Sequence, residues 1–137
     1  MFGVVIGFVV THYRGDRDSI VGLLEWGRMD IIRDGARWGF DFASLDEARR
    51  LVDTQVRSLE TCAKRVPSYP CMGKLPIEAN LMAAALEEES GDVKSRDLFV
   101  QKALDSCSEG GARLCSPDSA RRTVAALIAK RHGSKGL

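Results

Sequence analysis

The chain has few prolines, few histidines and no long apolar run, and each shortage excludes a class of protein. Only four of the 137 residues are proline, while 45% are hydrophobic, a composition that argues against an intrinsically disordered chain. No apolar run approaches the roughly 20 residues that a spanning helix needs. Twenty basic residues face nineteen acidic ones, so charge exerts no global pull toward nucleic acid. The length fits one domain or a short array of repeats.

Groups that could carry catalysis are equally scarce. The two histidines, His12 and His132, lie at opposite ends of the chain, whereas a catalytic base needs an orienting partner. Neither a phosphate-binding G-x-x-x-x-G-K-[ST] motif nor a zinc-binding H-E-x-x-H motif occurs. We interpret the acidic run 87–89 as a solvated helix end and His132 as an ordinary cation near a helix C-terminus. We therefore expect no catalytic site, no metal and no cofactor.

The first ten residues, MFGVVIGFVV, are apolar throughout. They lack the basic start and the cleavage site of a secretory signal, and they are too few to span a bilayer. Three interpretations stay open: a buried strand or short helix, a half-inserted membrane anchor, or a segment that docks on a partner. We treat 1–15 as a docking or anchor segment whose apolar contacts come from Phe2, Val4, Val5, Ile6, Phe8 and Val9.

Hydrophobic periodicity predicts an all-α domain over residues 16–133, followed by a basic tail at 134–137. Ser44 and Glu47 form a capping-box pattern, and Asp34-Gly35 predicts the end of the first helix, with Gly39 in the following loop. The predicted helices cover 20–33, 44–62, 76–90, 95–107 (with Ser95 as cap) and 117–133.

Two features of the first helix predict what lies in the core. Its apolar stripe is expected to face inward, and four aromatic residues in and after it are expected to fill the core rather than a ligand pocket. The stripe consists of Ile20, Leu23, Leu24, Gly27 and Ile31, and the aromatic residues are Trp26, Trp38, Phe40 and Phe42.

An internal duplication is the sharpest pattern in the chain. The hexapeptide Arg-Ser-Leu-Glu-Thr-Cys at 57–62 recurs as Lys-Ala-Leu-Asp-Ser-Cys at 102–107. A second cysteine follows each copy, Cys71 in the first and Cys115 in the second. Beyond it, five residues of the first copy match five of the second at a constant offset: Pro76, Ala79, Ala84, Ala85 and Leu86 match Pro117, Ala120, Ala125, Ala126 and Leu127. The unit helix, Cys, loop, Cys, helix is therefore present twice.

We interpret the duplication as tandem antiparallel helical hairpins, each closed by a local disulfide. The bridges would be Cys62–Cys71 and Cys107–Cys115, each contributing about 2.5–3 kcal/mol through loop closure. Two alternatives stay open: one zinc site from all four cysteines, although neither spacing fits the usual C-x2–4-C, or free cytosolic thiols. Disulfides would imply an oxidising compartment.

These motifs resemble the cysteine-rich Sel1-like repeat proteins, a TPR-like family. The stretch Glu-Ser-Gly-Asp-Val-Lys-Ser-Arg-Asp at 89–97, with Lys102-Ala103 and Cys107 after it, is similar to the loop and following helix of such repeats. Leu-Asp-Glu-Ala at 45–48 resembles the same element one repeat earlier. The resemblance covers roughly 41–132 and implies αα-hairpins bridged at helix ends, although the loop has one glycine where the family has two.

The C-terminal part is locally basic. Residues 120–137 hold five basic side chains and no acidic one. Because no aromatic residues are interleaved with these cations, nucleic-acid binding is not expected. A solvated helix face or an acidic protein partner explains them better. The predicted contact residues are Arg121, Arg122, Lys130 and Arg131.

Together these patterns predict a non-catalytic interaction protein, an accessory or assembly subunit of a larger, membrane-associated complex of respiratory-chain type. Disulfides with an apolar N-terminus fit the mitochondrial intermembrane space or inner membrane. The alternative is a free-standing periplasmic or secreted binding protein, such as an inhibitor or immunity-type protein.

Overall fold

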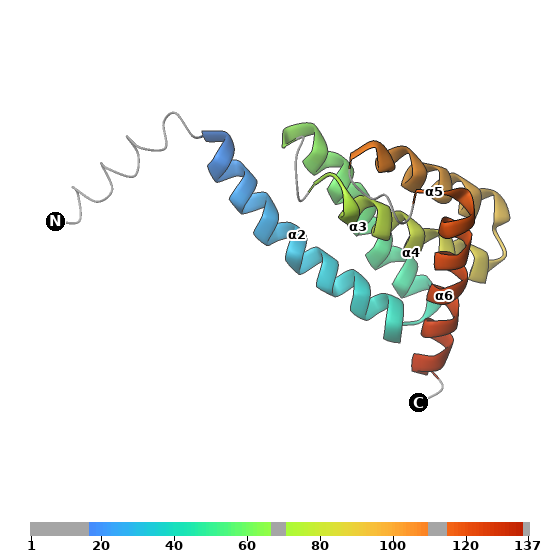
Figure 1. Ribbon diagram of the computed structural model, residues 1–137. Helices are drawn as coiled ribbons and strands as arrows, with labels where there is room; N and C mark the ends of the chain where they lie inside the picture. Colours follow the sequence, from blue (N-terminus) through green and yellow to red (C-terminus); the bar gives the residue numbers. More distant parts are fainter. Residues whose placement is uncertain (1–16, 67–70, 110–114, 136–137) are drawn as a thin grey trace, which may run out of the picture.

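The computed structural model describes residues 17–66, 71–109 and 115–135, and in these ranges the chain is all-helical (Figure 1). The docking segment predicted at 1–15 lies outside the described residues. The elements are α2 (Arg17–Phe42), α3 (Leu45–Arg65), α4 (Lys74–Ser90), α5 (Val93–Asp105), the short 3-10 helix η1 (Ser106–Glu109) and α6 (Pro117–Lys135). The predicted fold class, all-α, is confirmed.

Helix α4 is the centre of the molecule and contacts α3, α5 and α6 (Figure 1). Most of its side chains are buried, whatever direction they point. Small residues at 83–85 let the neighbouring helices approach closely, and larger apolar residues fill the space between them. Helices that are apolar all round are typically core helices. The largest of its fully buried side chains are Ile77, Leu81 and Leu86.

Helix α2 is longer than predicted. It continues through Asp34-Gly35 and ends at Phe42, so the expected stop at residue 34 and the loop at Gly39 are wrong. Gly39 is instead a point of close helix contact, because a Cβ there would overlap the side chain of Leu51 on α3. A glycine at a helix crossing and a glycine at a helix end look the same in a single sequence.

The inner face of α2 is also not the predicted one. The buried apolar side chains are Met29, Ala36 and Phe40, whereas Leu24 and Ile31 from the predicted stripe are 69% and 76% exposed. Of the four aromatic residues expected in the core, only one is buried; the exposed ones are Trp26, Trp38 and Phe42. The helix is apolar on two faces, so periodicity alone did not show which face packs on α3.

The cap of α3 is the residue that the sequence predicts, whereas the cap of α5 is a different one. The Ser44 hydroxyl accepts a hydrogen bond from the Glu47 N–H at 3.4 Å, as the capping-box pattern predicted. Helix α5 begins earlier than expected, because Asp92, and not Ser95, is its cap. The Asp92 carboxylate accepts the Ser95 N–H at 3.0 Å and the Ser95 hydroxyl at 2.7 Å. These two hydrogen bonds, first the backbone one, lower the pKa of Asp92.

The lowered pKa of Asp92 predicts an acid-sensitive contribution to stability. A carboxyl whose folded pKa lies below its unfolded value of about 3.9 stabilises the fold above that value, and the contribution is lost as pH falls through the folded pKa. We expect Asp92→Asn, which retains an acceptor but does not titrate, to show a shallower loss of unfolding free energy between about pH 5 and pH 2. Urea unfolding at a series of pH values measures this slope. Equal slopes for the two proteins would contradict the role of Asp92.

Both predicted disulfides are present. Cys62 is bonded to Cys71 and Cys107 to Cys115, with Cα–Cα distances of 5.4 and 5.5 Å. The duplicated sequences do not occupy equivalent environments. Ala84 on the central helix α4 is fully buried, whereas its counterpart Ala125 on the outer helix α6 is exposed. That the two bridged units are copies of one hairpin repeat stays a prediction.

Candidate interaction groove

The predicted partner-binding cations divide into two groups. Arg121, Arg122 and Lys130 are exposed on α6, as a partner contact requires. Arg131 is only 1% exposed and is not available to a partner, so its predicted role is wrong. Its position on the helix turns it inward toward the end of α2.

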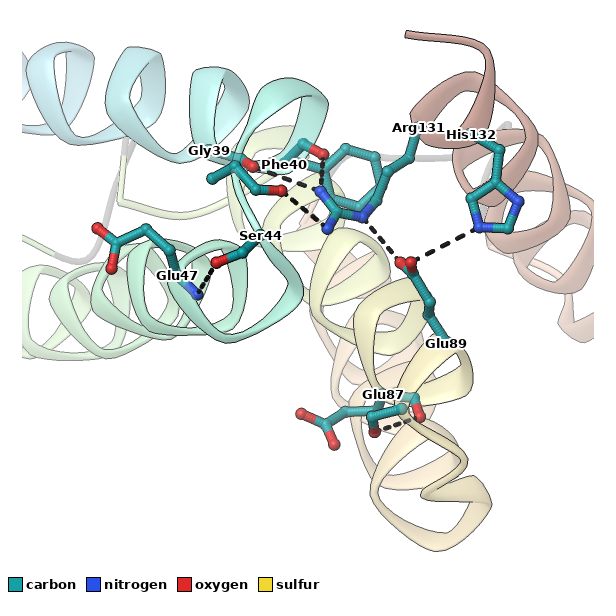
Figure 2. A network of polar contacts seen from close by, with 10 residues as sticks. Gly39, Phe40, Ser44, Glu47, Glu87, Glu89, Arg131 and His132 are labelled. Carbon is teal, nitrogen blue, oxygen red and sulfur yellow. Dashed lines mark hydrogen bonds and ion pairs between the residues drawn. The ribbon is translucent and has the colours of Figure 1, made fainter. Parts of the chain in front are cut away.

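Arg131 holds the C-terminal end of α2 against α4 and α6 (Figure 2). Its guanidinium donates to the carbonyl of Ala43 at 3.0 Å, to that of Gly39 at 3.5 Å, and to that of Phe40. Its Nε donates to the Glu89 carboxylate at 2.8 Å. The last carbonyls of a helix lack intrahelical donors and carry partial negative charge, so a buried cation is well placed there. Arg131 is therefore a structural residue.

The sequence predicts that the acidic run 87–89 is a solvated helix end, and this prediction is wrong. Successive residues on a helix point about 100° apart, so the three carboxylates diverge toward three neighbouring helices. Each meets a different arginine: Arg49 on α3 donates to Glu87 at 3.1 and 3.0 Å, Arg96 on α5 to Glu88 at 2.7 Å, and Arg131 on α6 to Glu89. The run thus anchors α4 to three helices, which offsets the unfavourable placement of acidic groups at a helix C-terminus.

His132 lies beside this network. Its Nε2 is 3.6 Å from Glu89 Oε1, and its side chain is 60% exposed. Glu89 already accepts the hydrogen bond from Arg131, so the exposed His132 is a peripheral member of this network. In the parts of the chain that the structure describes, no group of three His, Cys, Asp or Glu residues could hold a metal ion.

A groove lies between α2, α4 and α6. Its volume is about 500 Å³, and residues from all three helices line it. Apolar side chains form the floor and charged ones the rim. The lining residues are Arg37, Phe40, Asp41, Lys74, Glu78, Leu81, Met82, Thr123, Leu127 and Lys130.

The charges on the rim are arranged as exposed ion pairs. Glu78 lies 3.0 Å from Arg37 and 3.6 Å from Lys74, and Asp41 lies 3.6 Å from Lys130. The three cations are 54%, 72% and 63% exposed, more than the carboxylates they accompany. The rim therefore carries one more positive than negative charge, and its cations reach solvent.

Comparison with known proteins adds no functional assignment. No family model, curated protein or solved structure matches the chain. Among the described residues, no helix has the length and apolarity that crossing a membrane would require.

Lys130 is the one residue of this groove that the sequence predicts as a site residue. The rest come from three helices and carry no local motif: Arg37 and Asp41 lie on α2, and Lys74 and Glu78 on α4. The only sequence signal for this groove is the stretch 120–137, which contains basic residues and no acidic ones. The remaining residues meet only when α6 packs on α4 and α2 packs on α3 and α6.

Proposed function

We propose that this chain is a non-catalytic protein-interaction module, an accessory or assembly subunit that binds an apolar segment of another subunit in the α2–α4–α6 groove. The observation that supports this best is the groove itself, an open cavity of about 500 Å³ with an apolar floor and an excess of cations on its rim. Apolar burial would supply the affinity, and the rim would select partners with acidic residues beside the apolar segment.

The cations on the rim can exchange their carboxylate partners at little cost in free energy. Exposed ion pairs contribute only about 0–1 kcal/mol, so Arg37, Lys74 and Lys130 can leave Asp41 and Glu78 for carboxylates of a bound protein. Within the proposal, the apolar segment 1–15 attaches the module to a membrane or to a neighbouring subunit.

A peptide titration tests the groove. The probe is an amphipathic helical peptide with leucines on one face and aspartates at both flanks, compared with the same peptide carrying lysines at those flanks. We expect the acidic peptide to shift the backbone NMR signals of Leu81 and Leu127, and to bind about fivefold more tightly than the basic one. Absence of shifts at the groove with both peptides would overturn the proposal.

Two charge reversals on one helix provide a matched comparison. Lys130→Glu reverses a charge on the rim. Arg121→Glu makes the same change at a second predicted contact residue of α6, which lies outside the groove and is not part of the proposed binding site. We expect Lys130→Glu to abolish the preference for the acidic peptide and Arg121→Glu to retain it. Equal effects of both variants would mean that net charge, and not the groove, selects the peptide.

The disulfides are compatible with an oxidising compartment. Within that constraint we propose the mitochondrial intermembrane space or inner membrane, based on the resemblance to cysteine-rich Sel1-like proteins and on the apolar N-terminal segment. Periplasmic or secreted placement is the alternative. Maleimide labelling of protein from acid-quenched cells checks this, because four reactive thiols would contradict any oxidising compartment.

A further inference from the structure

A second pocket lies between α3, α4 and the C-terminal end of α5 and shares no lining residue with the groove. On α4, Pro76 and Asn80 line this pocket, whereas Lys74, Glu78 and Leu81 line the groove about half a turn away around the helix. The volume of the second pocket is about 290 Å³. A cavity of roughly 150 Å³ holds benzene, so a molecule of about ten non-hydrogen atoms fits here.

The walls of the second pocket are largely apolar. Val56 and Leu59 on α3 are buried and line it. The disulfide from Cys71 to Cys62 on α3 ties the segment that carries Met72 to that helix, and the unbranched side chain of Met72 can adapt to a ligand. Binding sites for small molecules are typically apolar, with a few polar groups that fix the orientation of the ligand.

One polar group in the second pocket lacks a hydrogen-bond partner. Asn80 is 6% exposed, and its Nδ2 donates to the Pro76 carbonyl at 2.8 Å, which holds the amide against a second residue of the pocket. The buried Oδ1 of Asn80 accepts no hydrogen bond from the described residues. Most buried side-chain oxygens are hydrogen-bonded, because leaving one without a donor is costly. A ligand with an N–H group would supply the missing donor.

The charged side chains that line the second pocket carry one more negative than positive charge. Lys102 lies 3.3 Å from Glu60, and its ammonium is also 5.4 Å from the centre of the Phe99 ring. Asp105 accepts a hydrogen bond from the neutral Gln101 at 2.9 Å, so its charge is additional to the pair of Lys102 and Glu60. This excess disfavours anionic ligands and favours neutral or cationic ones.

We propose that the second pocket binds a small, mainly apolar molecule of neutral or positive charge whose N–H group donates to Asn80 Oδ1. The volume sets the size of the ligand, the oxygen without a donor selects the N–H group, and the carboxylates exclude anions. The site is independent of the peptide groove, so failure of either proposal leaves the other intact.

A pair of probes with the same shape tests the hydrogen bond. Indole and indene differ in that indene has a methylene group where indole has its N–H. We expect indole to bind the full chain about fivefold more tightly than indene, and to shift the NMR signal of the Asn80 side-chain amide. Equal affinities, or no shift at Asn80, would overturn the proposal. This comparison uses the wild type and does not depend on the stability of any variant.

Two amide-to-leucine substitutions provide a matched comparison. Asn80→Leu removes the acceptor and retains an apolar side chain of similar size, so the variant should bind indole and indene equally well. Gln55→Leu is the control, because Gln55 is a 1% exposed amide whose Oε1 and Nε2 also lack partners, but it does not line the pocket. We expect this control to retain the fivefold preference for indole. A preference that persists in Asn80→Leu, or is lost in both variants, would contradict the role of Asn80.

Charged derivatives of the same ring test the selection by charge. We expect tryptamine, a cation, to bind about fivefold more tightly than indole-3-acetate, an anion, and Asp105→Asn to reduce this preference to about twofold. Asp118→Asn is the control, because Asp118 lies on α6 outside the pocket and its side chain is 81% exposed. Tighter binding of indole-3-acetate, or equal effects of the two variants, would overturn the assignment of a neutral or cationic ligand.

Discussion

Replacing Arg131 with alanine is expected to lower the free energy of unfolding by about 3–5 kcal/mol. The side chain is 1% exposed and joins Glu89 to three carbonyls at the end of α2. Its removal would leave the carbonyls of Phe40 and Ala43 without this donor, whereas that of Gly39 would keep the hydrogen bond from the Ala43 N–H. Glu89, whose side chain is 21% exposed, would lose its arginine. Breaking a buried charge pair on one side is costly because the remaining charge stays desolvated.

Denaturant unfolding monitored by circular dichroism measures this loss. Arg121→Ala is the matched control, because it removes the same side chain from the same helix at a position where that side chain is 78% exposed. We expect the control to change the unfolding free energy by less than about 0.5 kcal/mol. A loss below about 1 kcal/mol for Arg131→Ala would contradict the structural role of its contacts.

Removing the first disulfide is the second large effect that we expect. The double variant Cys62→Ala/Cys71→Ala should have a free energy of unfolding lower by about 2.5–3 kcal/mol, because the unfolded chain gains conformational entropy without the cross-link. Both cysteines are also buried, at 0% and 1% exposure, so packing contacts are lost in addition. Denaturant unfolding of the variant and the wild type measures the difference.

The second bridge provides the comparison. Cys107 and Cys115 close a loop of similar length, with a sequence separation of 8 against 9, but they are only half-buried. Cys107→Ala/Cys115→Ala should therefore cost less than the first double variant. Peptide mapping of the unreduced wild type is the control for both. Crossed pairing or four free thiols would contradict the predicted bridges.

Local signals predicted the elements that depend on neighbouring residues. Ser44 caps α3 because a hydroxyl at that position satisfies a free N–H whatever surrounds the helix. The turn after α4 is likewise local, since Gly91 adopts a positive φ of 88° that glycine tolerates best. The predicted cap of α5 is wrong by three residues, because Asp92 and Ser95 are both good cap residues. Only the hydrogen bond from the Ser95 N–H to the Asp92 carboxylate shows that Asp92 is the N-cap.

The groove and the charge network were not predictable in this way. Lys130 was visible as part of a basic stretch, but nothing in its surroundings indicates Asp41, which lies on a helix 89 positions earlier. Glu87–Glu89 looked like a solvated run because three adjacent charges usually point to water. Three arginines from different helices change that outcome, and none of them is near the run in sequence except Arg96.

The sequence by itself determined that this protein is helical, where most of its helices begin and end, and which cysteines pair. These properties arise from short-range hydrogen bonds, periodicity and a visible duplication. The tertiary structure alone decided which face of α2 is inside, since Leu24, Ile31 and Phe40 are equally apolar and only packing against α3 distinguishes them. It also decided that Arg131 is buried, because a buried arginine needs acceptors that two other helices supply at a distance in the chain.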